Sequence, residues 1–153
     1  MKCFVHSIIV TLLFFLVHDQ GYSQQIDKND VAIYIYRHKQ TYASGTKIEI
    51  RLNSKPIGKL KNGSRMIIKT NTKDSLIFTG FNHLNHKISS NCVIIHPKSG
   101  NKYYIETDFW GQIWSNEFAI NIFSRDSIIG KKEFTNPKLF KDKYDEIRIF
   151  NVP

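Results

Sequence analysis

The sequence has 153 residues, of which 41% are hydrophobic and 23% are charged, and 22 Lys and Arg against 13 Asp and Glu give it a formal net charge of +9. A chain of this length and composition forms one globular domain, which excludes two-domain, fibrous, coiled-coil and disordered classes. Aromatic residues make up 13% of the chain and supply large side chains for a core, whereas 4 Pro and 8 Gly leave little room for linkers.

Residues 1–23 have the features of a secretory signal peptide. A basic residue near the start precedes the apolar run 8–17, which is half as long as the roughly 20 residues that span a bilayer. Small residues, Gly21 and Ser23, lie at the −3 and −1 positions of a cut after residue 23. We therefore expect a mature domain of residues 24–153 that has no transmembrane segment and is periplasmic or secreted. The alternative is an uncleaved membrane anchor.

Cleavage leaves Cys92 as the one cysteine of the mature chain, because Cys3 is removed with the signal peptide. Cys3 also precedes the apolar run, whereas a lipoprotein cysteine must follow it. A single cysteine forms no intrachain disulfide, so packing alone must stabilise the domain. Cys92 begins the apolar run 92–95, and we expect a buried, small hydrophobic residue there; the alternative is a reactive thiol.

The mature chain is dominated by the period of two that is typical of β-strands. Residues 31–36 are apolar on both faces and rich in β-branched and aromatic side chains, which indicates an interior strand. In residues 46–52, Thr, Ile and Leu at the even positions alternate with Lys, Glu and Arg at the odd positions. This alternation predicts a strand with one buried face.

Residues 62–64, Asn-Gly-Ser, are expected to form a three-residue loop between two paired strands. Leu60 then faces Met66 and Lys61 faces Arg65, which keeps the apolar pair together. A two-residue turn would instead set Leu60 against Arg65. The three-residue loop places two like charges opposite one another, an unfavourable arrangement that an anion or a nearby carboxylate would relieve.

Further strands are expected at residues 65–70, 75–81, 92–96, 102–107, 117–123 and 145–150. No window of a dozen residues has a clear period of 3.6, so no long amphipathic helix is expected. A short helix or turn fits residues 136–144, because Pro137 suits the first position of a helix. Strands at spacings near ten residues predict an all-β fold, an antiparallel β-sandwich of about seven to eight strands.

Three short segments stand out: AIYIYR at 32–37, KPIGKLKNGS at 55–64 and GNKYYI at 100–105. Their order resembles a bacterial family of small extracytoplasmic β-domains of unknown function, with I-Y-x-Y-R, G-K-x-I-G-x-L-x-N-G and G-K-x-Y-Y motifs. The resemblance covers roughly residues 31–107 and implies a compact sandwich similar to carboxypeptidase-regulatory-like modules, without assigned catalytic residues. Residues 72–75 replace the family's usual P-G-x-H, and the chain lacks the lipid-bearing cysteine of many members.

No established catalytic signature is present in the sequence. The chain lacks a G-x-S-x-G elbow, an H-E-x-x-H helix and a phosphate-binding G-x-x-x-x-G-K loop. Cys92 and His96 are not a nucleophile–base pair, because four residues of strand span about 13 Å. His83 and His86 would point to opposite faces of a strand, so we expect loop histidines; the alternative is a zinc site with His38 or His96. We therefore predict no catalytic residues, no metal and no cofactor.

Both tryptophans lie in residues 108–116, in or beside the connection between two expected strands. Trp110 and Trp114 are the strongest candidates for ligand contact, because aromatic faces in a loop stack on sugars or pack into a partner's groove. The simpler interpretation, which we favour, is that both rings cap the open end of the sandwich.

Basic residues concentrate along the expected hairpin and in the C-terminal part of the chain. Residues 1–23 contain one Lys and one Asp, so the mature chain stays at +9. Such a surface attracts anions, and Lys59, Lys61 and Arg65 are its candidate binding residues. The expected partner is an envelope protein or an anionic envelope polymer, and not nucleic acid, since the chain is exported. The alternative is a solvated face that confers solubility.

These features together predict an exported, non-enzymatic β-sandwich that serves as a binding or accessory module of the bacterial cell envelope. Its expected contact surfaces are the tryptophan segment, the basic hairpin or an exposed strand edge. Two alternatives stay open: a small exported hydrolase whose site is assembled from residues distant in the sequence, and a protease inhibitor that presents a rigid loop. An enzyme would need a pocket with ionisable groups of perturbed pKa.

Overall fold

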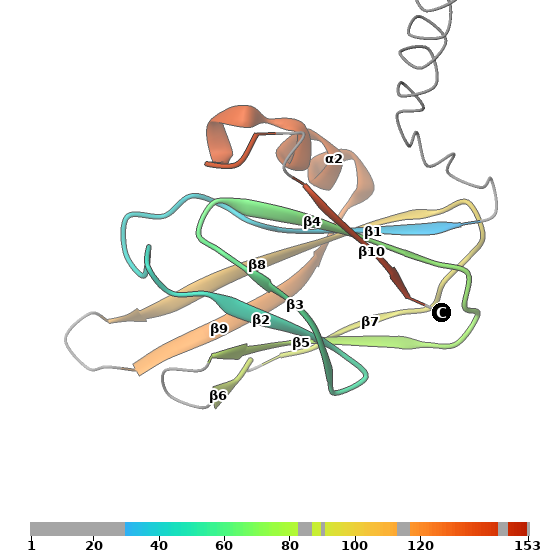
Figure 1. The fold of residues 1–153 in the computed structure, drawn as a ribbon, viewed down its shortest axis with the longest axis horizontal. Coiled ribbons are helices and arrows are strands. Elements are labelled where there is room, and N and C mark those ends of the chain that lie inside the picture. The colour runs from blue at the N-terminus through green and yellow to red at the C-terminus, as the bar shows by residue number, and fades with distance from the viewer. Residues whose placement is uncertain (1–29, 83–86, 90, 113–116, 144–146, 153) are drawn as a thin grey trace, which may run out of the picture.

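The computed structural model describes residues 30–82, 87–89, 91–112, 117–143 and 147–152. Within these ranges, two five-stranded sheets pack face to face (Figure 1). The strand order of the first sheet is β10-β4-β1-β8-β9, and that of the second is β3-β2-β5-β6, with β7 also paired to β5. The predicted all-β sandwich is thereby confirmed, although the described residues contain ten strands rather than seven to eight.

The first sheet consists of β1 (Val31–Arg37), β4 (Ser64–Thr70), β8 (Lys102–Gln112), β9 (Glu117–Arg125) and β10 (Arg148–Val152). The second sheet consists of β2 (Ile48–Leu52), β3 (Lys55–Leu60), β5 (Leu76–Asn82), β6 (Lys87–Ile88) and β7 (Val93–Ile95). Most neighbouring strands are antiparallel, but β1 runs parallel to β8 and β10 runs parallel to β4. The first sheet is therefore mixed.

The main hydrophobic core fills the space between the two sheets. β1 is an interior strand, as predicted, because it pairs with β4 on one side and with β8 on the other. The predicted alternation of β2 is confirmed for its apolar residues, which are buried, while Glu49 is also buried and accepts a hydrogen bond from Arg51. The core includes Ile33, Ile35, Ile48, Ile50, Leu52, Ile105, Phe109, Ile120 and Ile122.

A third layer covers part of the outer face of the first sheet (Figure 1). It consists of α2 (Ser127–Thr135) and the short 3-10 helix η1 (Pro137–Leu139). The carboxylate of Asp126 accepts hydrogen bonds from two backbone N–H groups in the first turn of α2 and so caps the helix. Under this layer, a second and smaller core forms from Tyr36, Tyr104, Phe134 and Phe140.

The helix α2 lies where the sequence predicted none. It has nine residues, of which Gly130 and Phe134 are buried, and two buried positions are too few to produce a recognisable helical period. In the segment 136–144, where a short helix or turn was expected, the described residues contain only the three-residue helix η1.

The predicted hairpin at residues 62–64 is wrong. β3 pairs with β2 in the second sheet, whereas β4 pairs with β1 and β10 in the first sheet, so the chain changes sheets at this corner. In place of the predicted pairs, Leu60 pairs with Ile48, Met66 with Ile35 and Arg65 with Tyr36. Asn62 and Gly63 make the corner: both are buried, and Gly63 has a φ of +70°.

No helix in the described ranges is long and apolar enough to cross a membrane. The predicted signal peptide, residues 1–23, lies outside the described residues.

Candidate functional site

The third layer leaves part of the outer face of the first sheet uncovered, over β8 and β9. In this part, Trp110 lies opposite Ala119 and Asp108 lies opposite Asn121, with Phe123 two residues further along β9. Trp110 is 70% exposed, because the short side chain of Ala119 cannot cover an indole ring. These five residues are called the open β8–β9 face.

The other side of the same strands is anchored in the core. Phe109 and Ile122 are fully buried, and Ile120 is nearly so. A Cβ added at Gly80 of the second sheet would lie 2.7 Å from Ile120, so the two sheets are in close contact here. Trp110 therefore projects from a strand that the core holds in place.

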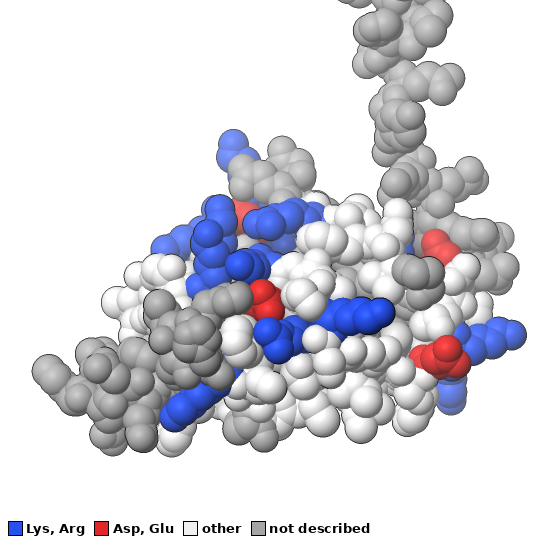
Figure 2. All heavy atoms as spheres, turned by 60° about the horizontal axis from the view of Figure 1, so that its bottom comes forward, with Lys and Arg blue, Asp and Glu red and all other residues white. Residues whose placement is uncertain are grey.

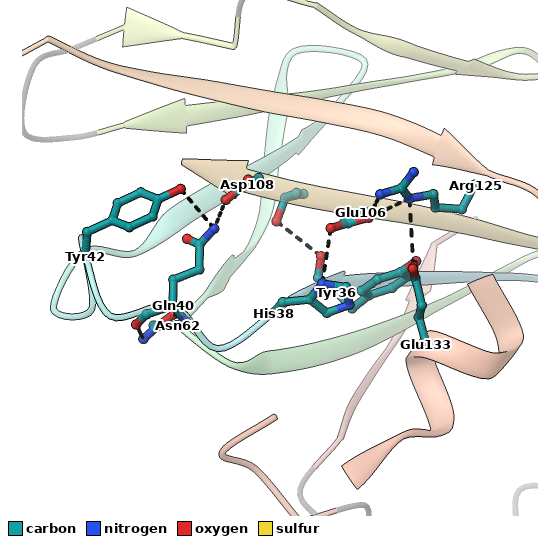
Figure 3. A network of polar contacts seen from close by, with 10 residues as sticks. Tyr36, His38, Gln40, Tyr42, Asn62, Glu106, Asp108, Arg125 and Glu133 are labelled. Carbon is teal, nitrogen blue, oxygen red and sulfur yellow. Dashed lines mark hydrogen bonds and ion pairs between the residues drawn. The ribbon is translucent and has the colours of Figure 1, made fainter. Parts of the chain in front are cut away.

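Beside the open face, a network of charged groups connects the sheet to α2 (Figure 3). Glu106 accepts hydrogen bonds from Arg125 at 2.5 Å and lies 3.2 Å from Nδ1 of His38. The guanidinium of Arg125 also lies 3.8 Å from the carboxylate of Glu133 on α2. Glu133 accepts a hydrogen bond of 2.6 Å from the hydroxyl of Tyr36. The network thus holds α2 against β1, β8 and β9.

The charges in this network stabilise one another. Burial alone raises the pKa of Glu106, but the hydrogen bonds and positive charges of His38 and Arg125 outweigh it, so this pKa lies below its ordinary value. Burial and the hydrogen bond to Glu133 raise the pKa of Tyr36. Glu106 is consequently an ionised, fully engaged carboxylate near neutral pH, which suits a structural ion pair better than a proton donor.

A second chain of polar contacts connects the open face to the corner at residues 62–63 (Figure 3). The side-chain amide of Gln40 donates to the carboxylate of Asp108. The side chain of Asn62 binds the backbone of Gln40 twice, accepting from its N–H and donating to its C=O, both at 2.8 Å. Tyr42 adds a hydrogen bond from its hydroxyl to the C=O of Phe109 at 2.5 Å. The connection between β1 and β2 is thereby fixed against β8.

Arg37, and not Trp110, closes the sandwich at this end. Its side chain is fully buried and donates to the C=O groups of Thr46 at 2.5 Å and Ala43 at 2.9 Å. Its guanidinium lies 4.7 Å from the centre of the Phe109 ring, and burial lowers the pKa of Arg37 to about 10. The interpretation that Trp110 caps the sandwich is therefore wrong, and Trp114 lies outside the described residues.

The predicted basic residues occupy different environments. Lys59 and Lys61 are exposed, and Figure 2 shows that Lys and Arg exceed Asp and Glu over much of the face it draws. Arg65 is only 4% exposed; its guanidinium lies 3.0 Å from Asp142 and donates to the C=O of Phe134 at 2.9 Å. Arg65 thus connects the sheet to the C-terminal segment and does not belong to the exposed surface.

The remaining candidates show no assembled catalytic or metal centre in the described residues. The prediction of a buried Cys92 is wrong, because this side chain is exposed and β7 begins one residue later. His83 and His86 lie outside the described residues. Within the described ranges, no group of three or more His, Cys, Asp or Glu residues is arranged to hold a metal ion.

One contact between a hydroxyl and an imidazole is present at the surface. The Oγ of Ser75 lies 2.9 Å from Nδ1 of His96, and both residues are exposed. A catalytic pair of this kind also needs a group that orients the imidazole and donors that stabilise an oxyanion. Among the described residues, no carboxylate forms an ion pair or hydrogen bond with His96.

Two of the resembling segments are neighbours in space. Residues 32–36 of β1 pair in parallel with residues 102–106 of β8, and the rings of Tyr34 and Tyr104 stack with centroids 4.9 Å apart. Comparison of the sequence with models of protein families and with curated proteins finds no match.

Proposed function

We propose that the chain is an exported, non-enzymatic binding module of the bacterial cell envelope, and that the open β8–β9 face contacts its ligand. The observation that carries this proposal is the 70% exposure of Trp110 on a regular strand. A large aromatic ring left in water on a rigid support is typical of binding surfaces, where burial of the ring on binding supplies much of the affinity.

The surroundings of Trp110 favour a ligand with both rings and polar groups. Phe123 is half-buried and widens the apolar surface, while Asp108 and Asn121 supply hydrogen-bonding groups beside it. Sugars have this combination of an apolar ring face and polar hydroxyl groups. The ion pairs of Glu106 and Arg125 support binding over catalysis, because these groups already hold the fold together.

Tryptophan fluorescence tests the proposal. The chain contains two tryptophans, so Trp114→Phe in the mature chain leaves Trp110 as the reporter. Titration with soluble glycans and envelope extracts should quench or shift this emission, because a stacked ring leaves water. In the matched variant Trp110→Phe, the emission of Trp114 should change much less. Binding seen by calorimetry without any change at Trp110 would refute the assignment of this face.

The alternative of a small hydrolase rests on the contact of Ser75 with His96. It predicts turnover of ester substrates that Ser75→Ala abolishes, because a serine hydroxyl beside an imidazole is suited to acyl transfer. A panel of chromogenic substrates and a panel of proteases test the hydrolase and the inhibitor alternatives, and turnover or protease inhibition by the wild-type chain would contradict the binding module.

A further inference from the structure

Three lysines from distant parts of the chain meet at the corner between β3 and β4. A Cβ added at Gly63 would lie 3.1 Å from Cγ of Lys141 and 3.3 Å from Cβ of Lys39. Lys61 precedes this glycine by two residues, and the backbone N–H of Lys141 donates to the C=O of Gly63 at 2.8 Å. All three lysines are exposed. They are called the lysine corner.

The positive charge of the lysine corner is not neutralised by the carboxylates around it. Asp142, which follows Lys141, is held by Arg65. The carboxylate of Asp108 accepts a hydrogen bond from Gln40 and interacts electrostatically with the buried guanidinium of Arg37, whose positive charge offsets it. Within the described residues, none of the three lysines has an ion pair. Three lysines carried by one corner form a local positive field that attracts anions.

The lysine corner and Trp110 belong to one surface. Lys39 is followed by Gln40, whose side chain contacts Asp108 and whose backbone is held by Asn62 of the corner. Asp108 and Trp110 lie two residues apart on the same side of β8, which corresponds to about 7 Å. The same hydrogen bonds therefore fix the spacing between β8, which carries Trp110, and the backbone that carries the lysines before any ligand binds.

We propose that Trp110 and the lysine corner together bind an acidic polysaccharide. One sugar ring stacks on Trp110, its hydroxyl groups reach Asp108 and Asn121, and the acidic groups of neighbouring sugars reach Lys39, Lys61 and Lys141. The inference rests on the proposed function and adds the chemical class of the ligand.

The groups beside Trp110 favour an acidic polysaccharide over other polyanions. A nucleic acid carries a phosphate at every nucleotide, so its charge would approach Asp108 wherever a base stacked on Trp110. An anionic membrane would require further large apolar groups beside the ring, whereas among the residues described on this face Asp108 and Asn121 are polar and Phe123 is half-buried. A polysaccharide in which acidic sugars alternate with neutral ones can stack a neutral ring on Trp110 and present its acidic groups to the lysines further along the chain.

The test uses calorimetry on the mature chain with hyaluronate oligosaccharides, in which a uronic acid alternates with a neutral amino sugar, and with a sulfated glycosaminoglycan. Fully methyl-esterified hyaluronate oligosaccharides, single-stranded oligo-dT and anionic phospholipid vesicles are the comparison ligands. We expect at least one acidic glycan to bind at 50 mM salt and to bind at least about tenfold more weakly at 200 mM, because salt screens exposed charges. The esterified glycan, which has the same rings without the charge, should bind much more weakly.

Two sets of variants assign the contributions. Trp110→Ala, and the triple variant Lys39→Gln, Lys61→Gln and Lys141→Gln, should each weaken glycan binding at least about tenfold at 50 mM salt. A matched triple variant, Lys55→Gln, Lys73→Gln and Lys98→Gln, loses the same charge at the opposite ends of the strands and should change affinity less than about twofold. Unfolding midpoints of all variants should match that of the wild type, since these side chains are exposed.

The outcomes separate the two proposals. Binding of the neutral glycan that depends on Trp110 but not on the lysines would overturn the acidic ligand and keep the binding face. Glycan binding that Trp110→Ala leaves unchanged would overturn both. The acidic polysaccharide is also refuted if no glycan binds, or if only oligo-dT or vesicles bind.

Discussion

Gly130 of α2 is the position where the packing of the third layer can be tested most directly. A Cβ added there would lie 2.3 Å from Cβ and 2.6 Å from Cγ of Tyr104. Because the contact is with a Cβ atom, no change of side-chain rotamer relieves it. The Tyr104 ring is also stacked on Tyr34 at 4.9 Å. In Gly130→Ala the helix itself must therefore move away from the sheet.

The magnitude follows from the required displacement. An ordinary carbon–carbon contact is about 3.5 Å or longer, so the helix must move by roughly 1.2 Å. Overpacking of this kind costs up to about 3 kcal/mol, and the displacement also loosens Phe134 in the smaller core. Alanine gains about 1 kcal/mol over glycine within a helix. We expect a net destabilisation of about 1–2 kcal/mol.

Urea-induced unfolding of the mature chain measures this effect. With an m-value near 2 kcal/mol/M, the midpoint should fall by about 0.5–1 M. Gly45→Ala is the matched control, because a Cβ there meets nothing within 4 Å; its midpoint should stay constant or rise, since alanine restricts the unfolded chain. If Gly130→Ala were as stable as Gly45→Ala, α2 would not be in close contact with Tyr104.

Three further substitutions test the remaining interactions. Glu106→Gln should cost about 1–3 kcal/mol at pH 7. A lowered carboxyl pKa contributes stability above the ordinary value near 4.5, and this stability is lost as the pH falls through the folded value. The difference between Glu106→Gln and wild type should therefore shrink below about pH 4, and a difference that stays constant with pH would contradict the ion pair. Arg65→Met should cost about 3–5 kcal/mol, because the partly buried carboxylate of Asp142 keeps its charge but loses its counter-ion. The exposed control Lys61→Met should change stability by less than about 0.5 kcal/mol; similar urea midpoints would show that Arg65 is not engaged as described. Ser54→Gly should stabilise the domain by about 0.5–1 kcal/mol, because Ser54 has a φ of +68° in the β2–β3 turn and glycine adopts this conformation without strain. A melting temperature below that of the wild type would argue against the described turn.

The candidate site shows where sequence reasoning was sufficient. Trp110 was recognised as a candidate because an aromatic residue beside a strand connection is visible in the sequence itself. The exposure of Trp110 could not be predicted from the sequence, because it depends on two residues that only the fold places. Ala119 lies opposite Trp110 on β9, and Arg37 closes the end of the sandwich that Trp110 was expected to close. The proximity of Lys39 and Lys141 could not be predicted either. The two residues are 102 positions apart in the sequence, and only the fold brings both to Gly63.

Local pattern alone determined that this chain forms strands and buries alternate side chains, because a period of two and runs of β-branched residues act within a few neighbouring positions. It correctly indicated β1 as an interior strand and the burial of the apolar positions of β2, but not the burial of Glu49 on the other face of β2. Only the tertiary structure decided which strands pair. Side-chain parity tells which residues share a face of a strand, but not to which sheet that strand belongs, so the turn at Gly63 became a corner between sheets. The burial of Arg65 was decided in the same way, by a carboxylate 77 residues away.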